Sequence, residues 1–366
     1  MATTRGTWAY RDRFGDRFGR TYFRRFGPGV CSSIGIGTYL GDPTDEVDDR
    51  YEAALATALD HGINHVDTAV NYRHGRSERV VGRALERASV DRDAVVVATK
   101  GGFVPFDGDR PADPAAYVRE RFVETGLVDP SDLARGCHCI APNFVEAMLD
   151  RSLSNLGVDA VDCYYVHNPE TQLEIRDREA VYDRLEAAFE RLERRRAAGD
   201  LYGYGVATWE AFRVSADHEK HLSLPEILAR AEAAADRVGN DDSGFLAVQL
   251  PFNVVMADAF TVDSQPTPDG DGRTSVLERA HEAGVHVVAS ASLAQGDLAV
   301  GEGMPSEIDA ALAGDTRAQR AINFARSAPG VTTALVGASR TTHVEENVAA
   351  GTFDPLGART FDAVFR

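Results

Sequence analysis

The sequence predicts an α/β protein built as a (β/α)8 (TIM) barrel, and three observations support this fold class. Short apolar or β-branched runs alternate with longer amphipathic stretches eight times after Gly29, which is typical of parallel βα units. Glycine follows four of the amphipathic stretches, as it often does at helix ends, at Gly62, Gly157, Gly199 and Gly284. The sequence has neither a P-loop pattern nor the strand-to-helix glycine fingerprint of a Rossmann fold, which removes the main rival for nucleotide binding.

The eight predicted strands are short and largely apolar, as expected of strands buried on both faces of a parallel barrel. In chain order they cover residues 30–36, 64–67, 94–99, 160–166, 203–207, 245–250, 285–289 and 333–336. The predicted helices cover residues 48–60, 77–88, 144–156, 178–198, 224–238, 274–283, 315–327 and 342–350.

Two segments exceed a bare barrel. Residues 1–29, in which Arg-Phe-Gly occurs three times, are expected to form an N-terminal cap at the bottom of the barrel domain of residues 30–366. A nucleic-acid or membrane arm is the alternative for this segment, but the acidic residues within it favour the cap. Residues 101–142 follow the third strand and are rich in Gly, Pro and Asp. Because that position is the C-terminal face of a barrel, we expect this insertion to overhang the active site.

The charge balance excludes some partners. The chain has 57 acidic and 39 basic residues, a net charge of -18, which repels nucleic acid and anionic membrane surfaces. Lys100 and Lys220 are its only lysines, and the acidic excess is rich in Asp. Such a surface suits a high-salt cytoplasm, so we hypothesise a halophilic protein that loses structure on dialysis into low salt.

The remaining composition indicates a cytoplasmic protein. Cys31, Cys137, Cys139 and Cys163 are too few and too scattered for a disulfide framework, which favours a reducing compartment. The first ten residues, MATTRGTWAY, lack the apolar run of a signal peptide, and no apolar stretch reaches membrane-spanning length.

The most informative segment, residues 67–78, follows the second predicted strand and reads Asp-Thr-Ala-Val-Asn-Tyr-Arg-His-Gly-Arg-Ser-Glu. It resembles the aldo-keto reductase superfamily, whose pattern there is Asp-Thr-Ala, a tyrosine three residues on, then Gly-x-Ser-Glu. The resemblance runs from Ile-Gly-Ile-Gly-Thr at 34–38 to Glu-Glu-Asn at 345–347. It implies a catalytic tetrad of Asp67, Tyr72, Lys100 and His167, each at or just beyond a strand end, where barrel chemistry sits.

The chemistry of these residue types agrees with that implication. A phenol with an ordinary pKa near 10 is a poor acid at neutral pH, so Tyr72 requires a cation that stabilises its phenolate, and Lys100 is the candidate. Lys100 ends an apolar run, where a buried ammonium requires a counter-ion such as Asp67. A purely structural ion pair, and a purely structural His167, are the alternatives.

The resemblance also implies a nicotinamide cofactor. Family members hold its amide with a Ser-Asn pair after the fifth strand, which here is Ala207-Thr208, and with a glutamine that is retained as Gln249. The position of the usual stacking aromatic is Ser290, so stacking must come from elsewhere, with Trp209 as a candidate. The expected cofactor contacts are Gly37, Thr38, Thr208, Gln249, Ser292, Leu293, Gln295, Gly337, Ser339, Arg340, His343, Glu346 and Asn347.

Arg340 bears on the choice of nucleotide. Its guanidinium is suited to a 2'-phosphate, which favours NADP(H) and leaves NAD(H) open. A surface arginine at a helix start is the alternative. The expected substrate contacts are Phe103, Asn168 and Trp209.

The implied function is an NAD(P)H-dependent reductase of an aldehyde, ketone or sugar carbonyl, or the reverse dehydrogenase, with a hydride from nicotinamide and a proton from Tyr72. The alternative is an NADPH-binding regulatory or sensor subunit with little turnover, which would resemble the barrel subunits of some ion channels. A barrel lyase or isomerase without nicotinamide is a third possibility. No metal is expected, because Cys137-His138-Cys139 lacks Cys-x-x-Cys spacing.

Overall fold

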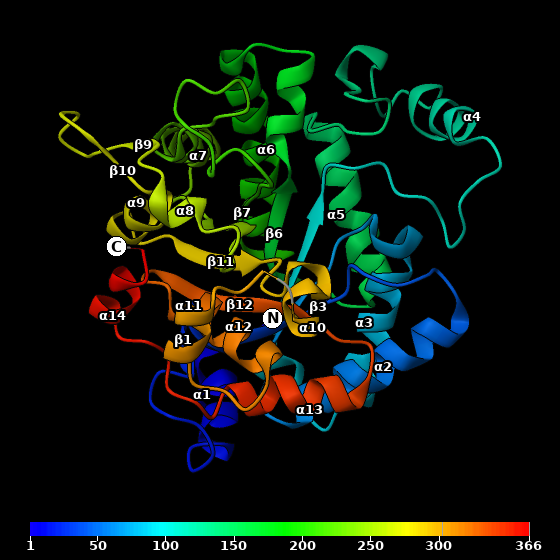
Figure 1. Cartoon of the computed structure of the whole chain (residues 1–366). Coiled ribbons are helices and arrows are strands. Elements are labelled where there is room, and N and C mark those ends of the chain that lie inside the picture. Colours follow the sequence, from blue (N-terminus) through cyan, green and yellow to red (C-terminus); the bar gives the residue numbers. More distant parts are fainter. Residues whose placement is uncertain (302, 366) are drawn as a thin grey trace.

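Eight parallel strands close into a barrel in the order β11-β12-β3-β4-β5-β6-β7-β8, which confirms the predicted (β/α)8 fold. The computed structural model describes residues 1–301 and 303–365. The barrel strands are β3 Ile34–Gly37, β4 His65–Asp67, β5 Val96–Gly101, β6 Val161–His167, β7 Leu201–Ala207, β8 Phe245–Pro251, β11 His286–Ser290 and β12 Val331–Gly337. The helices that alternate with these strands surround the barrel (Figure 1).

The eight helices predicted from the sequence begin and end within three residues of their predicted bounds, and the structure adds helices that were not predicted. Asp177 and Ser223 cap the helices α6 and α7 by accepting backbone N–H groups, and Gly199 ends α6 with a left-handed φ of 92°. In chain order the α-helices are α1 Thr4–Arg13, α2 Asp45–Asp60, α3 Arg76–Arg87, α4 Pro114–Val118, α5 Pro142–Leu156, α6 Arg178–Ala198, α7 Leu224–Val238, α8 Asp258–Thr261, α9 Val276–Glu282, α10 Asp297–Val300, α11 Ser306–Ala311, α12 Arg317–Ser327, α13 Thr341–Ala350 and α14 Ala358–Ala363.

The first predicted strand, residues 30–36, is wrong as a single element. Its first half is β2, Gly29–Ser32, which pairs antiparallel with β1, Phe23–Phe26. Its second half is β3, which pairs with β12 and β4 inside the barrel. The two strands are separated only by Ser33 and form one apolar run, which does not reveal that the pairing partner changes there.

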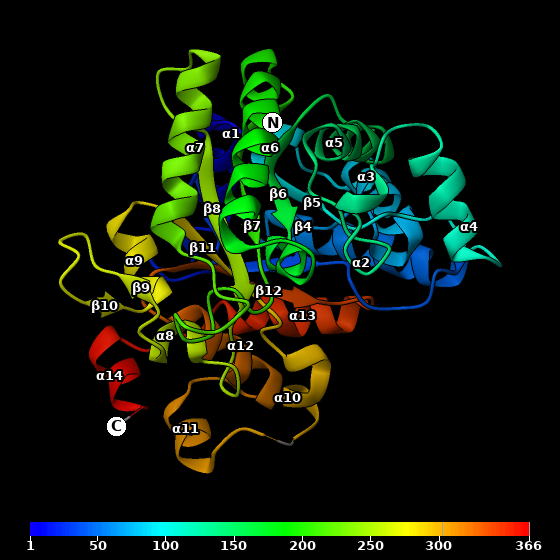
Figure 2. The same cartoon turned by 90° about the horizontal axis from the view of Figure 1, so that it is seen from above.

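The β1–β2 hairpin and α1 lie against the amino-terminal ends of the barrel strands. Phe26 packs on the rings of His65 and His286, which begin β4 and β11, at centroid distances of 5.3 and 4.9 Å. Arg24 donates at 2.6 Å to the carbonyl of Val331, which begins β12. Figure 2 shows α1 at one end of the barrel and α10 with α11 at the other.

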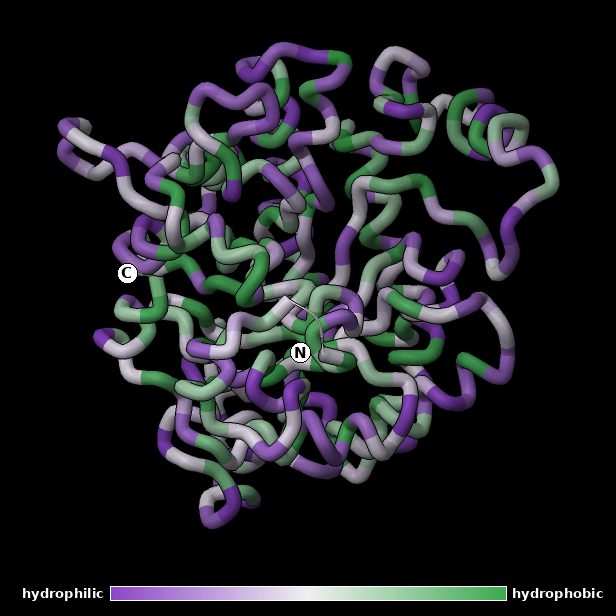
Figure 3. Tube along the Cα trace, in the orientation of Figure 1, coloured by the Kyte–Doolittle hydropathy of each residue, from purple (hydrophilic) through white to green (hydrophobic). Residues whose placement is uncertain are grey.

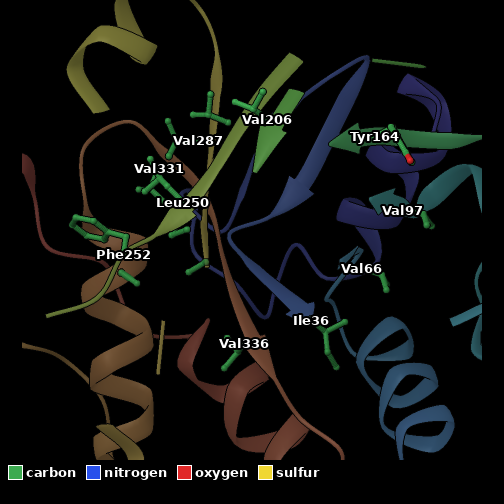
Figure 4. Packing of buried hydrophobic residues seen from close by; sticks show 14 of the residues in the cluster. Ile36, Val66, Val97, Tyr164, Val206, Leu250, Phe252, Val287, Val331 and Val336 are labelled. Carbon is green, nitrogen blue, oxygen red and sulfur yellow. The ribbon is translucent and has the colours of Figure 1, made fainter. Parts of the chain in front are cut away.

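The barrel has one hydrophobic cluster inside it and a larger one between the strands and the helices. Inside, small residues such as Ala98, Ala207 and Ala247 pack with Phe26 from the hairpin. Outside, strand residues facing the helices form the larger core, part of which is drawn in Figure 4. The hydrophilic stretches lie mainly toward the periphery (Figure 3), and no helix in the described ranges has the length and apolarity to cross a membrane.

Close strand packing at Gly205 leads to a stability prediction. A Cβ there would lie 1.8 Å from the carbonyl oxygen of Ala247 on the neighbouring β8 and 3.3 Å from Tyr165. Gly205→Ala is therefore expected to lower the free energy of unfolding by roughly 2–3 kcal/mol, because a backbone atom must move. Denaturant titration measures the change.

Gly357→Ala is the matched control, because nothing lies within 4 Å of a Cβ at Gly357. This variant is expected to stay within about 0.5 kcal/mol of the wild type. Equal stability of both variants would contradict the tight approach of β7 and β8.

The insertion of residues 101–142 packs along the outside of the barrel top. Its apolar residues, including Val118 and Phe122, form a small core with Val70 and with Phe144 of α5. In Figure 1 α4 projects away from the barrel beside α5. Of this insertion, Phe103 alone lines the pocket described below. The sequence predicted that the insertion overhangs the active site. The insertion packs against the loop after β4 instead, and only the Phe103 side chain reaches the pocket.

Candidate active site

A pocket of about 530 Å³ opens at the carboxyl ends of the barrel strands. The strand ends meet there because the register places Gly37 beside Asp67 and His167 beside Ala207. Expected site residues that line the pocket are Gly37, Thr38, Asp67, Tyr72, Phe103, His167, Asn168, Thr208, Trp209, Gln249, Ser292, Leu293, Gln295 and Gly337. The pocket thus brings residues from eight strand ends together.

Lys100 and Asp67 form a buried ion pair at the base of this pocket. The Lys100 ammonium donates to Asp67 Oδ1 and, at 2.8 Å, to the carbonyl of Thr68. Gln249 Nε2 donates to the other carboxylate oxygen, Asp67 Oδ2, at 2.8 Å. The Asp67 carboxylate is therefore satisfied on both oxygens, which offsets part of the cost of burying it.

Tyr72 lies directly above this ion pair. The Lys100 ammonium is 5.3 Å from the centroid of the Tyr72 ring, and the His167 ring centroid is 5.9 Å from it. Tyr39 places its ring edge-on at 5.0 Å. The four residues implied to form the tetrad thus lie together across the ends of β4, β5 and β6.

The turn that carries Tyr72 is strained. Arg73 and His74 adopt left-handed φ angles of 47° and 60°, which are uncommon for residues with a side chain and cost roughly 1–3 kcal/mol each. The buried Arg73 guanidinium pairs with the Asp48 carboxylate, to which Arg76 Nε also donates at 2.9 Å. This cluster fixes the turn and hence the point at which Tyr72 enters the pocket.

The expectation that Lys100 lowers the pKa of Tyr72 is not met. Burial raises the pKa of Tyr72 well above its ordinary value, and the Asp67 carboxylate raises it further. The physical reason is that the ammonium lies beneath the ring and donates to Asp67 and Thr68. Burial also lowers the pKa of Lys100, against the opposing effect of Asp67. Tyr72 is consequently a protonated phenol at neutral pH.

His167 is a neutral imidazole in this environment. Burial lowers its pKa well below the ordinary value, and the charge of Lys100 lowers it further. Its Nδ1 is buried and has no hydrogen-bond partner among the described residues. The neutral ring lines the pocket, so a ring nitrogen that faces the pocket can hydrogen-bond a ligand there.

His138, the centre of Cys137-His138-Cys139, supports the main chain at His167. Its Nε2 lies 2.8 Å from the carbonyl oxygen of His167, and Gln172 Nε2 lies 2.9 Å from its Nδ1. Burial lowers the pKa of His138 to about 4, so the neutral ring donates through Nε2 and accepts through Nδ1. No cluster of three or more Cys, His, Asp or Glu suited to a metal occurs within residues 1–301 and 303–365.

The residues expected to hold the cofactor lie partly in the pocket and partly beyond it. A Cβ on Gly37 would meet nothing within 4 Å, and the hydroxyl of Thr208 is buried without a partner in the described structure. Arg340 is exposed and directly precedes α13. The Glu346 carboxylate of α13 accepts a 2.6 Å hydrogen bond from the Thr316 hydroxyl, so it already has a partner.

Some expected residues lie outside the pocket lining, and some lining residues were not expected. Those outside are Lys100 beneath the floor and the more distal Ser339, Arg340, His343, Glu346 and Asn347. The unexpected ones are Tyr39, Leu40, Asn71, Ala291, Gly296, Leu335 and Val336, and Ala207 and Ser290 also line it, at the positions where the family's amide-binding and stacking residues usually lie. Tyr39 and Leu40 directly follow the first barrel strand, and this position was the signal that could have identified them.

A closed barrel with titratable side chains gathered at the carboxyl ends of its strands defines the class of (β/α)8-barrel enzymes. The sequence model of the aldo/keto reductase family matches residues 33–364. The chain therefore belongs to the aldo/keto reductase family.

Individual relatives are more distant. The chain is 32% identical to aldo-keto reductase AMT2 of Alternaria alternata over 155 residues, which span 40% of this chain and 41% of the fungal protein. It is 24% identical to a putative voltage-gated potassium channel subunit beta of Schizosaccharomyces pombe over 88% of this chain and 85% of that one. An aldo-keto reductase of Klebsiella pneumoniae in complex with NADPH has the same fold, with a TM-score of 0.61 at 20% identity and 94% of both chains covered.

Proposed function

We propose that the protein is an NAD(P)H-dependent reductase of an aldehyde, ketone or sugar carbonyl, and that Tyr72 donates the proton. The observation that carries the proposal is the contact of Tyr72 with His167 above the Lys100–Asp67 pair in one pocket. Family membership supports the same reaction type. The reverse oxidation of an alcohol uses the same groups.

The pocket fits a nicotinamide cofactor. The unpartnered hydroxyl of Thr208 is suited to a carboxamide, and the open faces of Gly37 and Gly337 leave room for a ligand against the strand ends. When bound, the cofactor supplies the hydride to the carbonyl carbon. The Klebsiella relative binds NADPH, and Arg340 is suited to a 2'-phosphate, so we propose NADP(H) as the preferred form.

The chain's own groups would then act on the carbonyl oxygen. The raised pKa of Tyr72 keeps its proton in place until negative charge develops on that oxygen. Neutral His167 orients the carbonyl by a hydrogen bond, and the Lys100 ammonium lies beneath the Tyr72 ring, 5.3 Å from its centroid. Asp67 holds Lys100 in place.

Arg340→Ala tests the nucleotide preference. We expect kcat/KM for NADPH to fall about tenfold and that for NADH to change little, because only the former carries a 2'-phosphate. Steady-state rates with each nucleotide measure this. Arg5→Ala is the control, since Arg5 is an exposed arginine on α1 at the opposite end of the barrel. Equal losses with NADPH and NADH would contradict the assignment.

A second candidate is a cofactor-sensing subunit with little turnover. The match to the channel beta subunit supports it, because that alignment covers most of both chains. NADPH binding without oxidation by any carbonyl would favour the sensor, and steady oxidation would favour the reductase.

The net charge of -18 supports a high-salt cytoplasm as the setting, so these assays belong in molar KCl as well as in dilute buffer.

A further inference from the structure

The strand that carries His167 ends in a sharp turn. Asn168, the next residue, adopts a left-handed conformation with a φ of 49°, which is uncommon for a residue with a side chain. Its N–H donates at 2.6 Å to the carbonyl of Ala207 on the neighbouring β7. The main chain changes direction directly after His167, so the direction of the His167 ring depends on what holds this turn.

The insertion of residues 101–142 supplies a hydrogen bond at the turn. His138, near the end of the insertion, is fully buried, and its Nε2 lies 2.8 Å from the carbonyl oxygen of His167. Because a carbonyl oxygen can only accept, Nε2 carries the proton and donates it. The last residue of β6 is thus tied to a side chain that a bare barrel would lack.

Gln172 fixes this tautomer of His138. Its Nε2 lies 3.3 Å from the carbonyl oxygen of Asp132, 3.0 Å from that of His138 and 2.9 Å from His138 Nδ1. Two of these three atoms are carbonyl oxygens, so the amide presents its nitrogen and His138 Nδ1 accepts. The His138 ring is held at both nitrogens and cannot rotate without breaking both hydrogen bonds.

The insertion also contacts the ring of His167. Phe103 lies edge-on to two rings, at centroid distances of 4.8 Å from His138 and 5.1 Å from His167. The main chain before Phe103 is fixed, since Cys139 N–H donates at 2.8 Å to the Gly102 carbonyl. A Cβ on Gly102 would lie 2.5 Å from the His167 carbonyl oxygen, so the two main chains approach as closely as glycine allows. The insertion therefore holds His167 at its carbonyl and at its ring.

The reaction proposed above depends on the placement of this ring. The His167 ring lines the pocket with its centroid 5.9 Å from that of Tyr72, so a substrate carbonyl that meets both groups tolerates little movement of either. A misplacement of about 1 Å at the reacting groups costs roughly a hundredfold in rate. An element that fixes the turn after His167 can thus govern the rate without touching the substrate.

Resting on the proposed reductase function, we propose that His138 is a positioning residue for the reaction and that the insertion takes part in catalysis through it. His138 does not line the pocket. It acts through His167, because its hydrogen bond fixes the turn at which β6 ends and hence the direction in which the His167 ring points.

His138→Leu and His138→Gln test this role at saturating NADPH. Leucine fills the space without donating, so we expect the single-turnover rate of 4-nitrobenzaldehyde reduction to fall about ten- to a hundredfold. Glutamine keeps an N–H donor near the position of Nε2, so we expect a rate within about threefold of the wild type. Fluorescence titration is expected to give the wild-type Kd for NADPH in both variants. Equal rates in the two variants would overturn the proposal.

His221→Leu is the matched control. His221 is another buried histidine whose pKa is lowered by burial to about 4, and its Nε2 lies 3.2 Å from Gln265 Nε2. It does not line the pocket. Its replacement is expected to lower stability, as the loss of a buried hydrogen bond does, and to leave the single-turnover rate unchanged. A loss of rate as large as that in His138→Leu would show general loosening and contradict a specific role of His138.

Gln172→Leu decides the question if His138→Leu does not fold. This variant keeps His138 and removes the donor to its Nδ1, which frees the imidazole to rotate. We expect the single-turnover rate to fall at least about threefold, with the Kd for NADPH unchanged. A wild-type rate in Gln172→Leu would count against the proposal.

Histidine NMR tests the positioning independently of turnover. In protein with 15N-labelled histidine and bound NADPH, the His167 ring signals are assigned by their absence in His167→Gln. We expect them to shift or broaden in His138→Leu and to keep nearly their wild-type positions in His138→Gln. Wild-type signals in His138→Leu would refute the positioning role. If the wild-type protein reduced no carbonyl, only the reductase function would fail, because shifted signals would still show that His138 positions the His167 ring.

Discussion

Tyr72→Phe is expected to lower kcat for carbonyl reduction roughly a hundred- to ten-thousand-fold, the range that a positioned general acid contributes. Only the hydroxyl is removed, so the ring contacts with Tyr39 and His167 remain. The affinity for NADPH is expected to change little. Single-turnover rates with NADPH measure the chemical step, and fluorescence titration measures cofactor binding.

Tyr39→Phe is the control for this experiment. It removes a neighbouring phenol hydroxyl from an exposed ring and leaves Tyr72 intact. If Tyr39→Phe abolished reduction and Tyr72→Phe did not, the proton donor would have been assigned to the wrong tyrosine. Unchanged turnover in Tyr72→Phe would refute the assignment outright.

Lys100→Met is expected to lower the free energy of unfolding by about 3–5 kcal/mol, because it leaves the Asp67 carboxylate buried without its cation. The double variant Lys100→Met with Asp67→Asn is expected to recover part of this loss, since neither partner then carries an unpaired charge. Denaturant titration at one fixed salt concentration measures both changes.

Lys220→Met provides an internal comparison, because Lys220 is the other lysine of the chain. It pairs with Glu174 at 2.8 Å near the surface, where an ion pair contributes no more than about 1 kcal/mol. A loss from Lys100→Met as small as that from Lys220→Met would mean that water reaches the Asp67 carboxylate when the ammonium is removed.

The sequence was sufficient for the barrel and for the grouping of its strand-end residues. Apolar runs that end in Asp67, Lys100 and His167 predict adjacent side chains, because parallel strands bring their carboxyl ends to one face. The division of residues 30–36 into a hairpin strand and a barrel strand was missed. Hydropathy does not record which strand pairs with which, and Gly29–Ser32 is as fully buried as Ile34–Gly37.

The sequence also could not predict properties that depend on the direction in which a side chain points. The position of Lys100 predicts an ammonium near Tyr72, but the pKa of Tyr72 depends on whether the ammonium meets its oxygen or the underside of its ring. His138 illustrates the same limit. Its neighbours in sequence are cysteines, whereas its hydrogen bonds go to His167 and Gln172, distant in the chain.

The two ends of the insertion are hydrogen-bonded to each other, so the shape of the pocket does not depend on the length of the loop between them. The main chains of Val104 and Cys137 are joined by a single hydrogen bond, so the intervening segment leaves and returns at almost the same point. A shorter turn could connect these two residues and leave Phe103 in the pocket lining, provided that the turn still covered Val70 and Phe144. The barrel can therefore exchange this loop as a module, and changes in its outer part need not alter which molecules the pocket accepts.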